Sequence, residues 1–432
     1  MRLCSSVDTL CAQSFGAGQK QLVGLVAQRA AVACTLVLLP ILAVWLYTEQ
    51  LLLLAGQEAG VSALAGSYVR WAAATLLPSL YCEVCKRYLQ AQAITVPQIW
   101  ISAAANLVHA FLCWLLVFRL EMGLIGAPLA FNITWWAMML MYFAYVRWGS
   151  ARVYRSTCPS GGWEWRAVCA GWGQLFALGV PGMLMLLSEW GSFELTALAS
   201  GWIGSVQIDT LVLLSNVTVA VFMVPLSLAI SASTLVGNAL GAAQPDQARL
   251  FARAALMLAF GFVLLELALM TAARDHVATV FTSDPDVLAE FCGHIWCLFL
   301  LLPFDCVQCV QGGVMRVAGF QALGARTNLA SYYLFGLPTG FALAFWEPAG
   351  KLGLTGLLLG LVIAVLCSAV VYTYKLRSVD WDAESARALA RVEEERGAMA
   401  AQLPSGARRT SSEKGTPQTA HTLPRCAGTA RL

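Results

Sequence analysis

Long runs of apolar residues constrain the fold of this chain more than any other feature of its sequence. Runs of this kind lie at residues 22–46, 98–118, 254–270 and 352–372, and each is close to the roughly 20 residues that a helix needs to cross about 30 Å of hydrocarbon. The 432 residues are 59% hydrophobic and 12% charged, whereas a soluble domain carries roughly 25% charged residues. A soluble core cannot bury so much apolar surface, so the sequence predicts a protein that crosses the membrane several times.

The spanning segments are expected to be helices rather than the strands of a barrel. Backbone amides in hydrocarbon must be hydrogen-bonded within the chain, which leaves only helices and closed barrels. The apolar runs lack the alternation that barrel strands show. We therefore predict an all-α polytopic membrane protein with about eleven segments. They lie at residues 1–14 in part, then at 22–47, 62–88, 97–118, 123–146, 171–200, 207–235, 250–272, 287–315, 326–346 and 352–376.

One phrase of the sequence occurs twice. VDTLCAQSFGAGQ at residues 7–19 matches ASTLVGNALGAAQ at 232–244, with Gly16 on Gly241 at a shift of 225 positions. Six segments lie between the copies, so both halves have the same orientation. Such duplications are typical of transporters, and this one predicts two pseudo-symmetric six-helix lobes. Further matching pairs follow at shifts of 224 to 230: Pro78/Pro303, Cys82/Cys306, Cys85/Cys309, Arg87/Arg316, Gln92/Gln321 and 122–130/352–360.

The two halves differ in one respect. A complete segment at residues 171–200 precedes the second copy of the phrase, and no counterpart precedes the first. We therefore expect an N-terminal lobe at 1–146 that lacks its first helix and part of its second, with its polar residues Asp8 and Gln13 exposed to lipid. The expected linker lies at 147–170 and the six-helix C-terminal lobe at 171–377. The rest, 378–432, is a polar tail, at most helical over 382–402 and otherwise disordered.

The distribution of Lys and Arg predicts the orientation, because cytoplasmic loops carry an excess of both. If the loop after the first phrase is cytoplasmic, the opposite side holds only Arg119, Arg274 and Lys351. The C-terminus is then cytoplasmic, and the net charge of +3 requires no nucleic-acid partner. The cytoplasmic side holds Lys20, Arg29, Lys86, Arg87, Arg147, Arg152, Arg155, Arg166, Arg249, Arg253, Arg316, Arg326, Lys375 and Arg377.

The cysteines and histidines do not predict a metal site. The pairs Cys82/Cys85 and Cys306/Cys309 have the spacing of metal ligands. Inside apolar segments, however, a thiol usually packs as a small hydrophobic group, and we interpret both pairs in this way. The four histidines are scattered along the chain. We therefore expect no metal and no cofactor.

A carboxylate inside a spanning segment costs free energy, because a charged group is placed within the bilayer, and such residues mark paths for ions, protons or substrates. Glu189 and Glu194 lie near the middle of segment 171–200, about 140° apart around a helix axis, so both can border one wide cavity. Trp190 lies four residues before Glu194, which places an aromatic ring on the same face. An organic cation is favoured by such acids together with cation–π attraction of about 0.5–2 kcal/mol. The alternative is that the two acids lie near the end of a helix and extend their side chains to the water at the membrane surface.

The other intramembrane candidates are Asp305, Asp8 and Gln13. Glu266 and Glu83 also fall in apolar runs, where they could equally face the headgroups, because no aromatic cluster lies beside them.

Three segments carry a resemblance to a known family: LGVPGMLMLLSEWGSFE, MVPLSLAISASTLVGNALGA and VDTLCAQSFGAGQ. They resemble signature segments of the multidrug and toxic compound extrusion transporters, in particular their animal branch. The resemblance implies a monomeric proton-coupled antiporter in the plasma membrane that exports organic cations. By motif, Glu189 and Glu194 match acidic positions for cation and proton binding. Asp305 and Asn216 fall where animal members usually have Glu, which bears on proton stoichiometry and substrate range.

The resemblance also implies a mechanism. A carboxylate in a low-dielectric site is more easily protonated than one in water, so a proton from outside can displace an exported cation, and a cytoplasmic cation can then displace the proton. We expect Glu189, Trp190 and Asp305 to line one central cavity between the two lobes.

Three alternatives remain at this stage. A lipid-linked sugar flippase of the same superfamily would need a strongly basic cavity for pyrophosphate, whereas intramembrane cations such as Arg70 are few. A truncated, transport-inactive isoform or fragment is a second alternative. A receptor or scaffold is the third, although about eleven helices in a duplicated array do not suit a seven-helix receptor.

Overall fold

The computed structural model describes residues 5–54, 56–149, 151–158, 165–280, 282, 284–346 and 351–402. This part of the chain is almost entirely helical and contains no strand. Eight of its helices are long and apolar enough to cross a membrane. The prediction of an all-α polytopic membrane protein is therefore confirmed.

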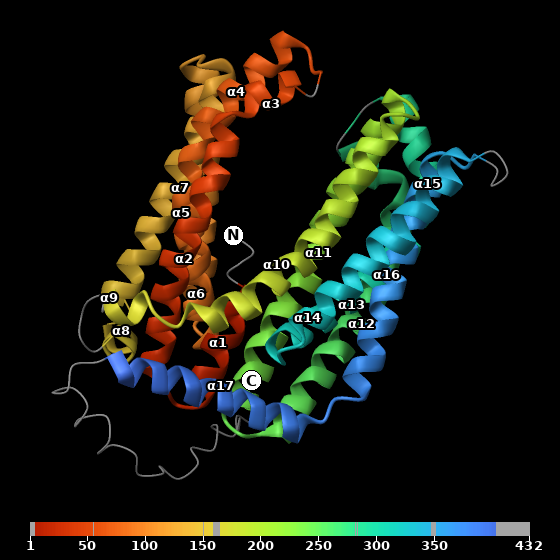
Figure 1. Cartoon of the computed structure of the whole chain (residues 1–432). Helices are drawn as coiled ribbons and strands as arrows, with labels where there is room; N and C mark the ends of the chain where they lie inside the picture. Colours follow the sequence, from red (N-terminus) through yellow and green to blue (C-terminus); the bar gives the residue numbers. More distant parts are fainter. Residues whose placement is uncertain are drawn as a thin grey trace, which may run out of the picture.

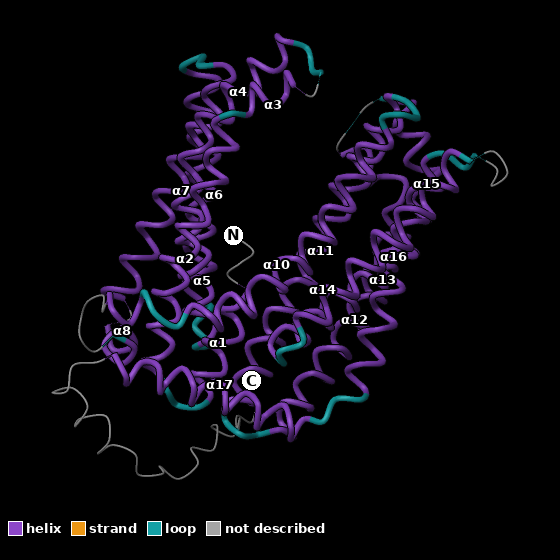
Figure 2. Tube along the Cα trace, in the orientation of Figure 1, coloured by secondary structure: helices purple, strands orange, loops and turns teal. Residues whose placement is uncertain are grey.

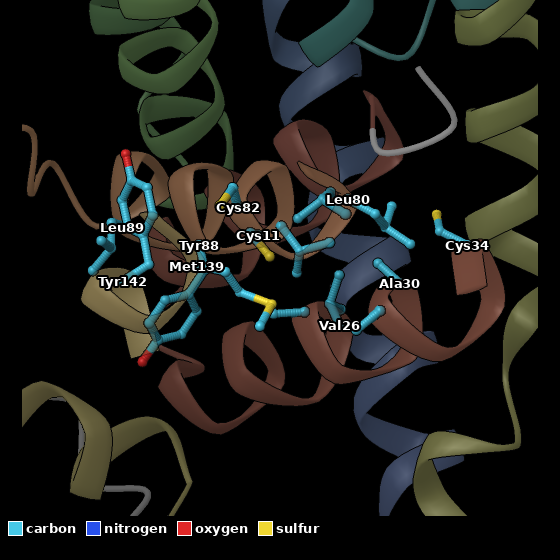
Figure 3. Close-up of a cluster of buried hydrophobic side chains, with 14 of the residues drawn as sticks. Cys11, Val26, Ala30, Cys34, Leu80, Cys82, Tyr88, Leu89, Met139 and Tyr142 are labelled. Atoms are coloured by element: carbon cyan, nitrogen blue, oxygen red, sulfur yellow. The ribbon is translucent and has the colours of Figure 1, made fainter. Parts of the chain in front are cut away.

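The first half of the chain forms one bundle. Its core contains large buried side chains such as Leu80, Leu89 and Tyr142 (Figure 3). The segment predicted at 62–88 is interrupted at η2 (Ala73–Thr75), just before Pro78. The α-helices are α1 (Ser5–Gly16), α2 (Lys20–Leu46), α3 (Thr48–Leu54), α4 (Ala59–Ala72), α5 (Leu76–Ala91), α6 (Val96–Cys113) and α7 (Gly126–Ala144).

The second half forms another bundle with its own core, which includes Leu214, Phe291 and Leu361. The segment predicted at 326–346 begins earlier and is divided by the π-helix η7 (Ala330–Gly336). The α-helices are α10 (Trp172–Ser200), α11 (Ser205–Gly241), α12 (Pro245–Val277), α13 (Pro285–Val317), α14 (Gln321–Leu329), α15 (Leu337–Phe345) and α16 (Leu354–Arg377).

The two bundles form a V. Figure 1 shows that they meet at one end of the molecule, where α1 lies between them, and diverge at the other end. The short helices α8 (Ala151–Thr157) and α9 (Trp165–Val168) lie beside the first bundle at the meeting end, and the chain passes from α9 through a short loop into α10 (Figure 2).

The duplicated phrase forms the crossing point of the two bundles. The backbones approach so closely that a Cβ added at Gly16 would lie 2.0 Å from the Asn238 carbonyl oxygen, and one added at Gly241 would lie 2.0 Å from the Gln13 oxygen. Because Gln13 aligns with Asn238 at the same shift of 225, the two contacts are equivalent under exchange of the halves. The sequence repeat is thus a structural repeat at this crossing.

The next helix end shows where the predicted alignment was wrong. Ala93 and Gly319 both have positive φ, 58° and 92°, and close the turns after α5 and α13. The two residues therefore occupy equivalent positions in the two halves, and they are 226 positions apart in the sequence. The alignment of Arg87 with Arg316 and of Gln92 with Gln321 needs a shift of 229 and does not hold, because turn geometry rather than residue identity fixes the register here.

Part of the predicted polar tail has a definite place. α17 (Trp381–Gln402) lies across the meeting end of the V (Figure 1). Ser385 Oγ donates a hydrogen bond to the Leu240 carbonyl oxygen in the second bundle, at 3.1 Å. Val392 packs in one cluster with Leu22 of the first bundle. The helix therefore contacts both bundles, whereas the disorder predicted after residue 402 lies outside the described part of the chain.

Candidate functional site: an acidic cavity in the second bundle

A cavity of about 250 Å³ lies between α10, α11 and α13. It brings together five of the residues predicted from the sequence: Glu189, Trp190, Glu194, Asn216 and Asp305. The remaining lining residues are Phe193, Ala197, Val212, Ser215, Thr218, Val219 and Phe222.

The register of α10 explains how one helix supplies both glutamates. Glu189, Phe193 and Ala197 repeat every four residues on one stripe, and Trp190 and Glu194 lie on the adjacent stripe. The two stripes together make a face wide enough to line one wall of the cavity, as their spacing predicts. Pro181 lies inside α10, eight residues before Glu189.

Asp305 reaches the cavity from α13 and is 4% exposed. It follows Pro303, which lies inside the helix and has no N–H to donate to the preceding turn. No described residue donates a hydrogen bond to Asp305 Oδ1. An acceptor buried without a donor costs roughly 1–3 kcal/mol, and this oxygen is on a side chain that lines the cavity, where a proton or a cation would satisfy it.

The acids of the cavity differ in exposure. Glu189 is 7% exposed and accepts a hydrogen bond from Gln308 Nε2 at 3.4 Å. Glu194 is exposed, and Trp190 is 39% exposed. The cavity thus combines two buried carboxyl groups with a third at a more open position. With aromatic walls and no basic residue among those that line it, the arrangement favours a small organic cation or a proton over an anion.

Asn216 lies on α11 in the same cavity, next to Ser215. The α11 wall is therefore polar but uncharged. Any bound cation would meet acidic groups only from α10 and α13.

The expected location of the cavity between the lobes was wrong. Each of its lining residues belongs to the second bundle. The periodicity of α10 predicted which face carries the acids, but it does not determine which neighbouring helix covers that face. That neighbour is α11, from the same bundle.

Asp8 and Gln13 lie elsewhere, and their predicted exposure to lipid was wrong. Asp8 forms an ion pair with Arg87, and Gln13 is fully buried. Gln13 Nε2 donates a hydrogen bond to the Val317 carbonyl oxygen at 2.8 Å. Both residues belong to the contacts of α1 rather than to the cavity, because Asp8 faces α5 of the first bundle and Gln13 faces α13 of the second.

Sequence reasoning left Glu266 undecided, and the structure places it inside the bundle. It is 4% exposed, and neither carboxylate oxygen has a hydrogen-bond partner among the described residues. A signal was available, because Glu266 continues a stripe of buried small residues on α12 at spacings of three and four: Ala248, Ala252, Ala255, Ala259 and Val263.

The two cysteine pairs lie in different bundles, Cys82/Cys85 on α5 and Cys306/Cys309 on α13. They therefore do not form one joint site. Cys306 Sγ donates to the Ala259 carbonyl oxygen at 3.7 Å, a contact that fits the packing role expected of these thiols.

Comparison with known proteins places this chain in a family. The model of the MatE family matches residues 1–115 and 181–342. Multidrug and toxin extrusion protein 1 of Mus musculus is 33% identical over 379 residues, which cover 88% of this chain and 65% of the mouse protein. Protein DETOXIFICATION 16 of Arabidopsis thaliana is 32% identical over 413 residues, covering 91% of this chain and 80% of the plant protein.

Solved structures have the same fold. The eukaryotic MATE transporter AtDTX14 superposes with a TM-score of 0.84 at 30% identity, covering 90% of this chain and 86% of that one. The Vibrio cholerae MATE transporter VcmN in its bent form has a TM-score of 0.72 at 18% identity, covering 91% of this chain and 85% of that one.

The chain spans about two thirds of the length of the animal relatives it matches, 65% for the mouse protein. The match of the family model over more than half of the sequence shows that the chain belongs to the MatE family.

Proposed function

We propose that this protein is a proton-coupled antiporter that exports organic cations and drugs by alternating access. The observation that carries the proposal is the cavity in which Glu189 and Asp305 are buried beside aromatic walls. The names of its relatives, multidrug and toxin extrusion proteins, support the same class of substrate. A flippase for pyrophosphate-linked lipids would need basic groups where this cavity has acids.

In the proposed cycle, a proton and a cation compete for the same carboxylates. A cation that enters from the cytoplasm is held by Glu189 and Asp305 and stacks against Trp190. After the bundles rearrange, protons from outside neutralise the carboxylates and the cation leaves. The proton gradient supplies the driving force, and no cofactor takes part.

The proposal also includes the setting of the protein. It acts as a monomer in the plasma membrane with α17 on the cytoplasmic side, and the lobes are residues 1–146 and 171–377, joined by the linker 147–170. The positions of Lys and Arg support this orientation.

The test is exchange of tetraethylammonium against an imposed pH gradient in proteoliposomes. Glu189→Gln keeps the shape of the side chain, but the amide can neither take up and release a proton nor neutralise the charge of a bound cation. We therefore expect driven uptake and equilibrium binding of the cation to be lost. Glu194→Gln should weaken both, because this residue is exposed. Asp305→Asn should have a smaller effect than Glu189→Gln, because the side chain of aspartate is shorter than that of glutamate. If Glu189→Gln vesicles still concentrate the cation, Glu189 is not the exchanging group.

A further inference from the structure

A second cavity, of about 360 Å³, lies at the meeting end of the V among α12, α13, α16 and α17. Three arginines line it: Arg249, Arg253 and Arg377. Gln311, Thr373 and Trp381 contribute polar or aromatic groups, and Ala252, Leu256, Leu376 and Val379 complete the wall. None of these residues lines the acidic cavity of the second bundle.

The helices bring the arginines together. Arg249 and Arg253 are four residues apart on α12, so both lie on one face. Arg377 is the last residue of α16 and lines the same cavity. At its inner wall Gln311 is 2% exposed, and its Nε2 donates to Thr373 Oγ1 at 2.7 Å.

Within the described part of the chain, the lining of this site carries three positively charged residues and no carboxylate. None of the three arginines forms an ion pair there. Of the carboxylates nearest in sequence, Asp380 caps α17 by accepting hydrogen bonds from the Asp382 and Ala383 amides, both at 3.1 Å. Asp246, in the first turn of α12, does not line the cavity.

We propose that this cavity binds the phosphate group of an anionic membrane lipid. Guanidinium groups present planar pairs of donors that match phosphate oxygens, and three arginines line this cavity. The leucines and Trp381 offer apolar surface for the glycerol and acyl part of a lipid, and tryptophan favours the membrane interface. Basic pockets between spanning helices on the cytoplasmic side are suited to anionic headgroups.

The proposal uses the cytoplasmic orientation put forward above and does not depend on cation export. Trp381 is the first residue of α17, so an occupied site would also hold the start of this helix against α12 and α16.

The purified chain is titrated in detergent with dioctanoyl phosphatidylinositol bisphosphate, dioctanoyl phosphatidylcholine or inorganic phosphate. Bound molecules are counted by native mass spectrometry, and the melting temperature is followed in parallel. We expect one tight site for the bisphosphate lipid, a higher melting temperature in its presence, and neither effect with phosphatidylcholine. Arg249→Gln, Arg253→Gln and Arg377→Gln should each weaken binding about tenfold, because each removes a charge-assisted contact.

Arg396→Gln is the matched control, because Arg396 is exposed on α17 and pairs with Glu393; it should bind the lipid as the wild type does. Glu189→Gln should also retain the lipid, which separates this proposal from the transport mechanism. A triple arginine variant that folds and binds the bisphosphate lipid as tightly as the wild type would overturn the site. Inorganic phosphate that binds as tightly as the lipid would overturn the choice of a lipid and leave free phosphate as the ligand.

Discussion

At the scale of single residues, the acidic cavity was largely predictable. The spacing of Glu189 and Glu194 on one helix places both on a wide face, and the structure puts both in one cavity with Asp305. Helical periodicity carries this information because it depends only on neighbours along the chain. Asp8 could not be placed in this way, because its partner Arg87 comes from another helix, and no local pattern specifies that contact.

The uncharged Asn216 offers a test of how charge in the cavity sets affinity. Asn216→Glu adds a carboxylate to a cavity that already holds three. We expect tetraethylammonium to bind about tenfold more tightly above neutral pH, since about 1.4 kcal/mol of added attraction corresponds to that factor. We also expect the gain to disappear in acid, where the new group is protonated. Equilibrium binding as a function of pH measures both.

Asn216→Gln is the matched control, because it has the length of the glutamate without its charge. Equal affinity of the glutamate and glutamine variants at every pH would show that charge at this position does not act on the cation.

At the scale of elements, the sequence predicted the helices better than their interruptions and contacts. The apolar runs identified the spanning segments, because burial in lipid depends on composition over about 20 residues. The break at η2 and the π-helix η7 were missed, since neither interruption contains a charged residue that would mark it in the sequence. α17 was predicted only as part of a polar tail, yet it contacts both bundles.

The crossing of α1 and α11 should be intolerant of any side chain. Gly16→Ala and Gly241→Ala each place a methyl group 2.0 Å from a backbone oxygen of the other helix, which backbone atoms cannot easily avoid. We expect each to destabilise the fold by about 1–3 kcal/mol or more, and to a similar extent because the two contacts are equivalent. Melting temperatures in detergent provide the measurement.

Gly173→Ala is the control for this pair, because a Cβ at Gly173 has no atom within 4 Å. Alanine there should be neutral or slightly stabilising, since glycine is a poor helix former. Tolerance of alanine at Gly16 but not at Gly241 would contradict the symmetry of the crossing.

The ion pair between Arg29 of α2 and Glu395 of α17 should be sensitive to loss of one partner. Their side chains are 1% and 5% exposed. Burial raises the pKa of the Glu395 carboxyl, and Arg29 beside it acts in the opposite direction. Glu395→Met leaves the buried guanidinium of Arg29 without its partner, so we expect the free energy of unfolding to fall by about 3–5 kcal/mol. The double variant, Arg29→Met with Glu395→Met, should be nearly as stable as the wild type.

The measurement is the melting temperature of the two single variants and the double variant, together with hydrogen exchange of residues 381–402. The double variant should recover both most of the stability and the protection of α17. A double variant that is less stable than either single variant would show that the ion pair itself, rather than the cost of an unpaired charge, determines the stability of this contact.

At the scale of the whole molecule, the repeat predicted two halves of equal orientation, and the reciprocal contacts of Gly16 and Gly241 show that the halves are equivalent where they cross. The V shape could not be predicted, because a sequence repeat gives the symmetry of two halves and not the angle between them. The meeting end is held by α1, whose Thr9 donates to the Arg316 carbonyl oxygen at 3.1 Å and accepts from Gln321 Nε2 at 3.0 Å.

The alternating access that we propose requires these contacts to break when the opposite end closes, so weakening them should shift the population between two states. Gln13→Leu removes the hydrogen bond to Val317 at the meeting end. We expect faster hydrogen exchange in α1, α14 and α17, and slower exchange at residues 200–205, where α10 turns into α11 at the diverging end (Figure 1).

Gln90→Leu, which breaks a hydrogen bond to Gln98 inside the first bundle, is the control and should leave hydrogen exchange at both ends unchanged. The opposite signs at the two ends distinguish rocking of the bundles from local loosening. Faster exchange at the meeting end with no change at 200–205 would mean that the bundles do not move as coupled bodies.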